Sequence, residues 1–215
     1  MPKTGNNFID FFSQVVIFFP LLPVFIIFFR RIYQKEALNY LVILCMLNFS
    51  QDITLQTLQI KYNGQLSIRH IFSLLEFIVI VQLFKTTVDG RLKEMINIFT
   101  IAIVSAMATY YLVKGAGEQR ILLDILKNFS LVMLTAYTLV TIVHQENLRI
   151  FYSAIFWIAT GTLFYFVIAL LLDVLEVYRP HVQNSIISDK MLLLNIASLA
   201  RYFFYTLATL LYIRQ

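Results

Sequence analysis

Residues 15–29 read VVIFFPLLPVFIIFF, fifteen consecutive positions without a charged side chain. A strand of a membrane β-barrel alternates apolar and polar residues, and this stretch does not alternate. Inside a bilayer the backbone must satisfy its own hydrogen bonds, so continuous apolar runs predict α-helices. Pro20 and Pro23 are expected to kink the helix that this stretch forms.

The composition extends this prediction to the whole chain. Of 215 residues, 60% are hydrophobic and 13% are charged, whereas a soluble domain has about 45–50% apolar and about 25% charged residues. No Gly/Ser linker or charge run divides the sequence, which predicts one domain, residues 1–215. The single cysteine, Cys45, excludes an intrachain disulfide.

Seven apolar runs are long enough to cross a bilayer, for which a helix needs roughly 20 residues. We therefore expect an all-α fold, a polytopic transmembrane helical bundle of about seven spans. The first run lacks a cleavage site and precedes two arginines, which favours a retained span over a signal peptide. The expected spans cover residues 8–29, 37–60, 67–84, 95–113, 121–144, 150–178 and 191–213.

The basic residues lie between the apolar runs and not along one face. Their distribution argues against a nucleic-acid partner and indicates contacts with anionic lipid headgroups of the bilayer. Eight flank one side of the expected membrane and seven the other, but the first loop alone holds Arg30, Arg31 and Lys35. Early loops usually dominate the positive-inside rule, which predicts an inner-membrane protein with its N-terminus outside and its C-terminus in the cytoplasm.

Polar residues recur at helical spacing inside five of the spans, where ionisable groups are costly and face the bundle interior. The second span carries a stripe of acids and amides, and the third and seventh carry similar stripes. We expect these faces to line a cavity that opens or is gated toward the outer side and binds a ligand. The candidate ligand-binding residues are Asn48, Asp52, Gln56, Arg69, His70, Ser73, Glu76, Lys127, Arg201 and Tyr205.

Counting residues from the helix ends places Glu76 and Arg201 near the membrane midplane. Arg69 shares a face with Glu76, but two helical turns separate them by roughly 10 Å, so direct pairing is not expected. Arg201 or Lys127 is the predicted partner of Glu76. The alternative to a ligand site is a structural ion pair that fixes helix packing.

Known catalytic and metal-binding patterns are not evident. A catalytic zinc needs about three protein ligands, and His144 falls at the opposite membrane face from His70 and His181, so we expect no metal site. Ser73 and His70 lie three residues apart on one helix, a spacing that rarely gives nucleophile geometry. No phosphate-binding or dinucleotide-binding loop occurs, and the last span has no lysine to hold retinal. The cofactor stays unassigned.

Three short segments resemble a family of small uncharacterised seven-span membrane proteins common in Bacteroidota. They are LNFSQD (residues 47–52), IRHIFSLLEF (68–77) and IFWIATGTLFYF (155–166). The resemblance implies the same span count and matches Asp52, His70 and Glu76 to the family's polar positions. The family carries no assigned activity, so the resemblance implies nothing about a substrate.

Three functions are consistent with this pattern. The first is a non-enzymatic bundle that binds a small polar or amphiphilic ligand as a sensor, carrier or accessory subunit. The second is an intramembrane enzyme on a lipid-linked substrate, with Asp52, His70 or Glu76 as acid or base. The third is a structural subunit that assembles with a membrane-protein partner.

Overall fold

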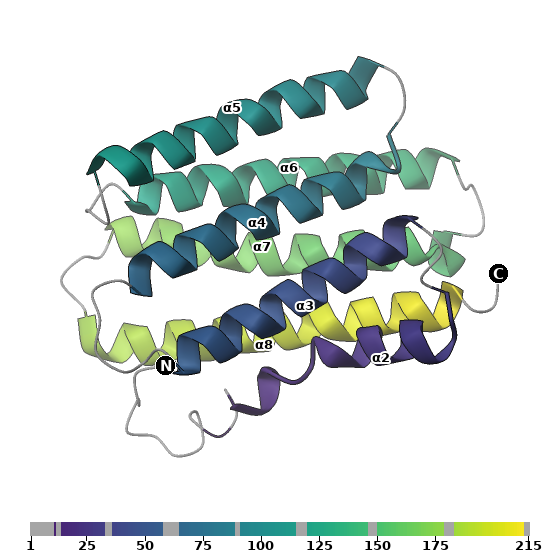
Figure 1. Cartoon of the computed structure of the whole chain (residues 1–215), viewed down its shortest axis with the longest axis horizontal. Helices are drawn as coiled ribbons and strands as arrows, with labels where there is room; N and C mark the ends of the chain where they lie inside the picture. The colour runs from purple at the N-terminus through teal and green to yellow at the C-terminus, as the bar shows by residue number, and fades with distance from the viewer. Residues whose placement is uncertain are drawn as a thin grey trace.

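The computed structural model describes residues 11, 14–32, 36–57, 65–88, 91–114, 120–145, 150–178 and 183–212. These residues form seven α-helices and one 3-10 helix, with no strand among them (Figure 1). The helices are α2 (Leu21–Phe29), α3 (Glu36–Thr57), α4 (Gln65–Lys85), α5 (Arg91–Lys114), α6 (Arg120–Gln145), η1 (Ile150–Tyr152), α7 (Ala154–Tyr178) and α8 (Gln183–Tyr212).

The all-helical prediction is confirmed, and four of the described helices are long and apolar enough to cross a membrane. Those segments are Glu36–Leu55, Ile121–His144, Ala154–Val177 and Lys190–Tyr212, in α3, α6, α7 and α8. Helices α4 and α5 have 21 and 24 residues but do not reach the same apolar content over their described residues. A count of seven spans therefore stays a prediction.

The first apolar run is interrupted where its prolines predict a kink. Residues 14–16 are helical, residues 17–20 form a turn, and α2 begins at Leu21. Pro20 has no N–H to give to Val16, and the Phe19 N–H bonds to the Val16 carbonyl instead at 3.1 Å. The structure describes residue 11 and residues 14–29 of the expected span 8–29, and residues 8–10, 12 and 13 lie outside the described part.

Two other boundaries differ from the expected ones. The sixth run is not one helix from residue 150, because η1 ends at Tyr152 and α7 begins at Ala154. The Ser153 N–H bonds to the Ile150 carbonyl and closes that short turn at 3.1 Å. Helix α8 begins at Gln183, ahead of the apolar run that starts near residue 191, because a helix can continue beyond the apolar segment that marks it in a sequence.

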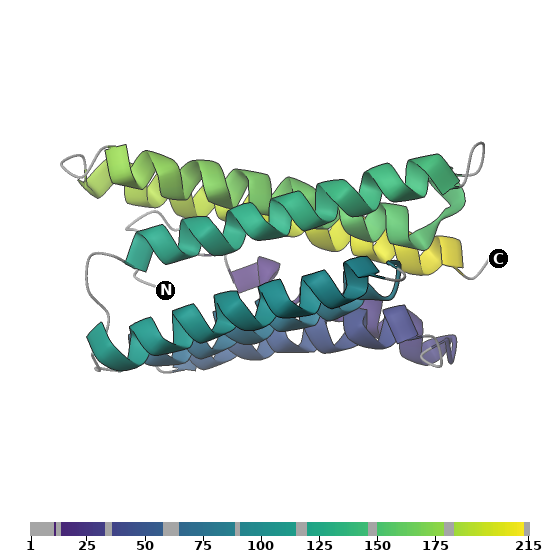
Figure 2. The same cartoon turned by 90° about the horizontal axis from the view of Figure 1, so that it is seen from above.

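The long helices form two layers, each built from three helices that are consecutive in the chain (Figure 2). Helix α4 packs between α3 and α5 in one layer, and α7 packs between α6 and α8 in the other. The layers meet where α4 packs on α6 and where α2 packs against both α3 and α8. Successive long helices run in opposite directions (Figure 1), so their ends gather at two ends of the bundle.

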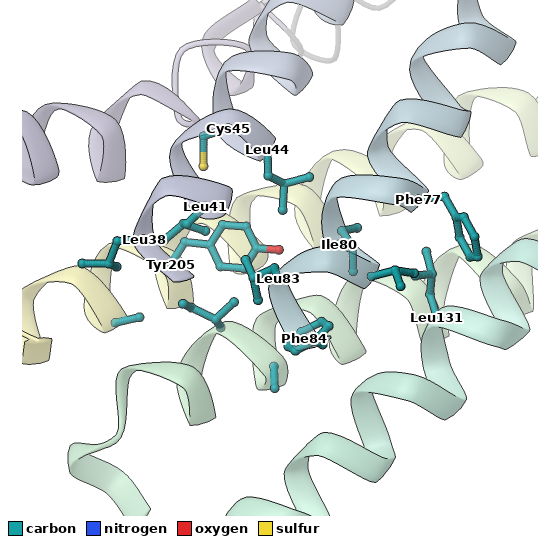
Figure 3. Close-up of a cluster of buried hydrophobic side chains, with 14 of the residues drawn as sticks. Leu38, Leu41, Leu44, Cys45, Phe77, Ile80, Leu83, Phe84, Leu131 and Tyr205 are labelled. Atoms are coloured by element: carbon teal, nitrogen blue, oxygen red, sulfur yellow. The ribbon is translucent and has the colours of Figure 1, made fainter. Parts of the chain in front are cut away.

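The apolar core joins both layers (Figure 3). Leucines from α3, aromatic and branched residues from α4, and Leu131 from α6 are buried together with Tyr205 from α8. Cys45 lies in the same cluster and is a free, fully buried thiol. The labelled residues of this core are Leu38, Leu41, Leu44, Cys45, Phe77, Ile80, Leu83, Phe84, Leu131 and Tyr205.

Candidate functional site

A buried ion pair joins the two layers. Arg201 on α8 donates from Nη1 to Oε1 of Glu76 on α4 at 2.9 Å, and their side chains are 3% and 12% exposed. The pairing with Arg201, one of the two partners predicted for Glu76, is confirmed. A charge inside an apolar bundle must be paired or solvated. The bond between Glu76 and Arg201 therefore explains how both charges are tolerated there.

Aromatic side chains surround the guanidinium of Arg201. Its Cζ lies 4.0 Å from the centroid of the Tyr165 ring and 5.0 Å from that of Tyr202. Nη2 also donates to the Tyr202 hydroxyl at 3.0 Å. A desolvated cation over an aromatic face gains about 2 kcal/mol. The third donor, Nε, is buried and has no partner among the described residues.

Helix α3 also carries a buried polar side chain, and its Cys45 belongs to the same core cluster as Tyr202 and Tyr205 of α8. Asn48 shares a helix face with Cys45, one turn before it, and with Asp52, one turn after it. The Asn48 side chain is buried, and its amide Nδ2 has no acceptor among the described residues.

Close packing of α7 on α8 positions Arg201. A Cβ atom built at Gly161 would lie 2.8 Å from Cβ of Phe204 and 3.1 Å from the Arg201 carbonyl oxygen, so only glycine fits there. One residue further on, Thr162 shares a 2.8 Å hydrogen bond with the Tyr205 hydroxyl, and both are fully buried. Arg201 and Tyr205 therefore project from a helix that is fixed against α7.

A second polar cluster lies toward the end of the bundle where α6 and α8 begin. Lys127 on α6 donates to Ser73 Oγ on α4 at 2.6 Å, which is a second polar link between the layers. Asn128 donates to Asp173 on α7 at 2.7 Å, and Lys190 on α8 forms ion pairs with Asp173 and Glu176. The Asn128 Oδ1 atom is buried and has no partner among the described residues.

The structure brings four of the ten predicted residues together at the junction of the layers, namely Ser73, Glu76, Lys127 and Arg201. Glu76 bonds with Arg201, Ser73 bonds with Lys127, and Tyr205 lies one turn from Arg201 on α8. Asn48 and Asp52 lie one turn apart on α3. The side chains of Gln56, Arg69 and His70 fall outside the described residues. Whether any of these residues binds a ligand stays a prediction.

Sequence reasoning did not assign Tyr165, Tyr202, Asn128 or Asp173 to the site, although each lies on a recognised polar face. Their roles depend on which helices are neighbours, and one sequence does not specify that. Thr162 was missed altogether. The small residue Gly161 beside it was a usable signal, because small residues mark close helix contacts in membranes.

Metal binding and cavities are the two remaining features of the described residues. Among them, no group of three histidine, cysteine or acidic side chains lies close enough to hold a metal ion. Two grooves, of about 540 and 470 Å³, run along α2 and the residues before it, and apolar side chains line them almost entirely. Neither groove is the predicted polar cavity, which stays a prediction.

The helical fold and the paired charged groups in its interior indicate the class of protein to which the chain belongs. The chain is a helical bundle with four candidate membrane spans and with charged groups paired in its interior, which is compatible with an integral membrane protein. No protein-family model, curated protein or solved structure matches the chain.

Proposed function

We propose that this protein crosses the inner membrane seven times and binds a small polar or amphiphilic molecule between its two helix layers. It acts as a sensor, carrier or accessory subunit, with the N-terminus outside and the C-terminus in the cytoplasm. Membership of the Bacteroidota family that its motifs resemble is part of this proposal.

The supporting observation is two unused buried donors, one on the arginine that joins the layers and one on α3. Arg201 Nε and Asn48 Nδ2 are both buried and lack acceptors among the described residues. Buried polar atoms nearly always have a partner, and an unpaired donor costs about 1–3 kcal/mol. Both atoms are donors, so the molecule that suits them presents oxygen acceptors, as a carboxylate, a phosphate or a carbonyl does.

The apolar side chains around the ion pair favour an amphiphilic ligand, whose headgroup supplies the acceptor oxygens. The ion pair lies within an apolar core to which both layers contribute. Such a site accepts an acidic headgroup at Arg201 and Asn48 while apolar side chains contact the rest of the molecule. The enzyme and structural-subunit alternatives have no specific observation in their favour and stay predictions.

Thermal unfolding of the purified full chain in mild detergent tests the proposal. Decyl phosphate and decanoate supply an oxygen-rich head on a ten-carbon tail, and decanol has the same tail without an anionic head. We expect the two anions to raise the unfolding temperature and decanol to leave it unchanged, because binding to the native state stabilises it.

Two variants of similar size make the test specific. Asn48→Leu removes one unused donor and should abolish most of the anion-induced shift. Thr135→Val is the control, since the Thr135 hydroxyl bonds only within its own helix, to the carbonyls of Leu131 and Val132. The proposal is wrong if no anion shifts the wild type, or if Asn48→Leu keeps the full shift.

A further inference from the structure

The C-terminal end of α2 joins an apolar groove to two exposed arginines, away from the ion pair between the layers. The groove lies between α2 and α3, has a volume of about 540 Å³, and is lined by Leu21, Val24, Phe25, Phe28, Phe29 and Met46. Phe28 and Phe29 are 56% and 83% exposed. Exposed apolar side chains on a bilayer-spanning bundle can contact lipid tails, which are as apolar as the side chains themselves.

Arg30 and Arg31 follow this groove directly. Both are exposed, and neither forms an ion pair with a described residue. The nearest described acid along the chain, Glu36, begins α3 and leaves them unpaired. Two positive charges that have no ion-pair partner among the described residues therefore lie at the end of an apolar groove.

The backbone at Arg31 strengthens the case for a role of its side chain. The Arg31 N–H bonds to the Phe28 carbonyl at 3.1 Å and the Ile32 N–H to the Ile27 carbonyl at 3.2 Å. This is the Schellman ending of a helix, in which the residue at the position of Arg31 is usually glycine. Arg31 has a φ of 55°, and it is the only non-glycine residue of the described chain with a positive φ. A cation here occupies a backbone conformation that disfavours it, a pattern common at functional positions.

We propose that this end of α2 is a binding site for one anionic phospholipid. An acyl chain lies in the groove beside Phe25, Phe28 and Phe29, and the lipid phosphate accepts hydrogen bonds from Arg30 and Arg31. Arginine suits this task because its planar guanidinium binds phosphate oxygens in pairs. Basic residues at the membrane surface attract anionic lipids, so charge complementarity selects the headgroup. The inference does not depend on the proposed ligand site.

Native mass spectrometry of the full chain in detergent, with equimolar phosphatidylglycerol and phosphatidylcholine of identical tails, measures the preference. We expect wild type to retain phosphatidylglycerol about tenfold more than phosphatidylcholine. The double variant Arg30→Gln with Arg31→Asn should reduce that ratio to about twofold or less, because asparagine tolerates a positive φ and removes only the charge.

The matched control removes two other charges from the same end of the bundle. Lys85 ends α4 and Lys93 lies in the first turn of α5, so Lys85→Gln with Lys93→Gln tests whether overall charge suffices. We expect it to keep the wild-type ratio. The proposal is overturned if this control lowers the ratio as much as the arginine variant, or if the arginine variant keeps it.

A fluorescence measurement locates the acyl chain. Trp157 is the only tryptophan, so Trp157→Phe with Met46→Trp places a single reporter in the groove. Phosphatidylglycerol with brominated tails should quench this reporter at a lower lipid fraction than brominated phosphatidylcholine. Equal quenching by both lipids would mean that acyl chains enter the groove without headgroup selection by Arg30 and Arg31. That result would overturn the proposal of one combined site.

Discussion

The junction within one helix layer and the junction between the two layers are built on different principles. Helices α7 and α8 touch at Gly161, where any Cβ would lie 2.8 Å from Phe204. The Trp157 ring stacks on Phe204 with centroids 5.7 Å apart. Helices α4 and α8 are instead joined across the layers by the long side chains of Glu76 and Arg201. The α7–α8 junction depends on the complementary shapes of the two helices, and the α4–α8 junction depends on the attraction between two charges.

This difference indicates which junction can change. Backbones in van der Waals contact cannot separate slightly without losing dispersion energy along the whole interface. Two long flexible side chains can stay bonded while their helices shift, and they release one another when a competing acid or base arrives. The α4–α8 contact is therefore more adaptable than the α7–α8 contact, and it also holds the unused donor of Arg201.

The largest effect is expected from breaking the charged junction on one side only. Arg201→Met leaves Glu76 buried without a partner and should lower the free energy of unfolding by about 3–5 kcal/mol. Arg201→Met combined with Glu76→Leu should recover most of that loss, because no charge then remains unpaired. Unfolding in mixed micelles measures both variants. A double variant as unstable as the single one would contradict a charge-based junction.

Breaking the shape-based junction should have the next largest effect. Gly161→Ala forces α8 away from α7, and overpacking of this kind costs about 1–3 kcal/mol. The same unfolding measurement applies. Unlike the charged junction, this one should not be rescued by any change at Glu76, and a rescue there would show that the two junctions are coupled.

A smaller effect tests the hydrogen bond inside the shape-based junction. Tyr205→Phe removes the 2.8 Å bond to Thr162 and should cost about 0.5–1.5 kcal/mol. A double-mutant cycle with Thr162→Val isolates the pair. Strictly additive losses would mean that shape alone holds α7 and α8 together here.

The smallest effect lies outside both junctions and has the opposite sign. Arg31→Gly relieves the positive φ of 55° but makes the unfolded chain more flexible, so the net gain in stability should be below about 1 kcal/mol. Thermal unfolding in neutral detergent measures it. A loss of stability in that medium would show that the arginine side chain stabilises the helix end by itself.

The sequence was informative about helices and their faces but not about neighbours. Periodicity identified the polar side of the helix that carries Glu76, and residue counting placed it at the depth of Arg201, which the 2.9 Å bond confirms. The sequence left Lys127 as an equally good candidate for the partner of Glu76, because the polar face of one helix does not show which helix packs against it. Lys127 bonds to Ser73 instead.

Local chemistry explains what else was and was not predictable. The kink near Pro20 follows from a missing N–H, which is visible in the sequence. The break before Ala154 has no such marker, because Ile150 and Tyr152 could equally continue a helix. The roles of Gly161 and Thr162 depend on contacts with α8, which only the folded chain creates.

The order of helices in the layers has a consequence for synthesis. The layer α3–α5 is complete in the chain before α6 begins, yet Glu76 finds its partner only 125 residues later. At about 5–20 residues per second, translation delivers Arg201 about 6–25 s after Glu76 leaves the ribosome. During that interval Glu76 lacks the partner that it has in the folded chain. A chain that stalls before α8 therefore keeps Glu76 without this partner, and an unpaired ionisable group inside an apolar bundle is costly.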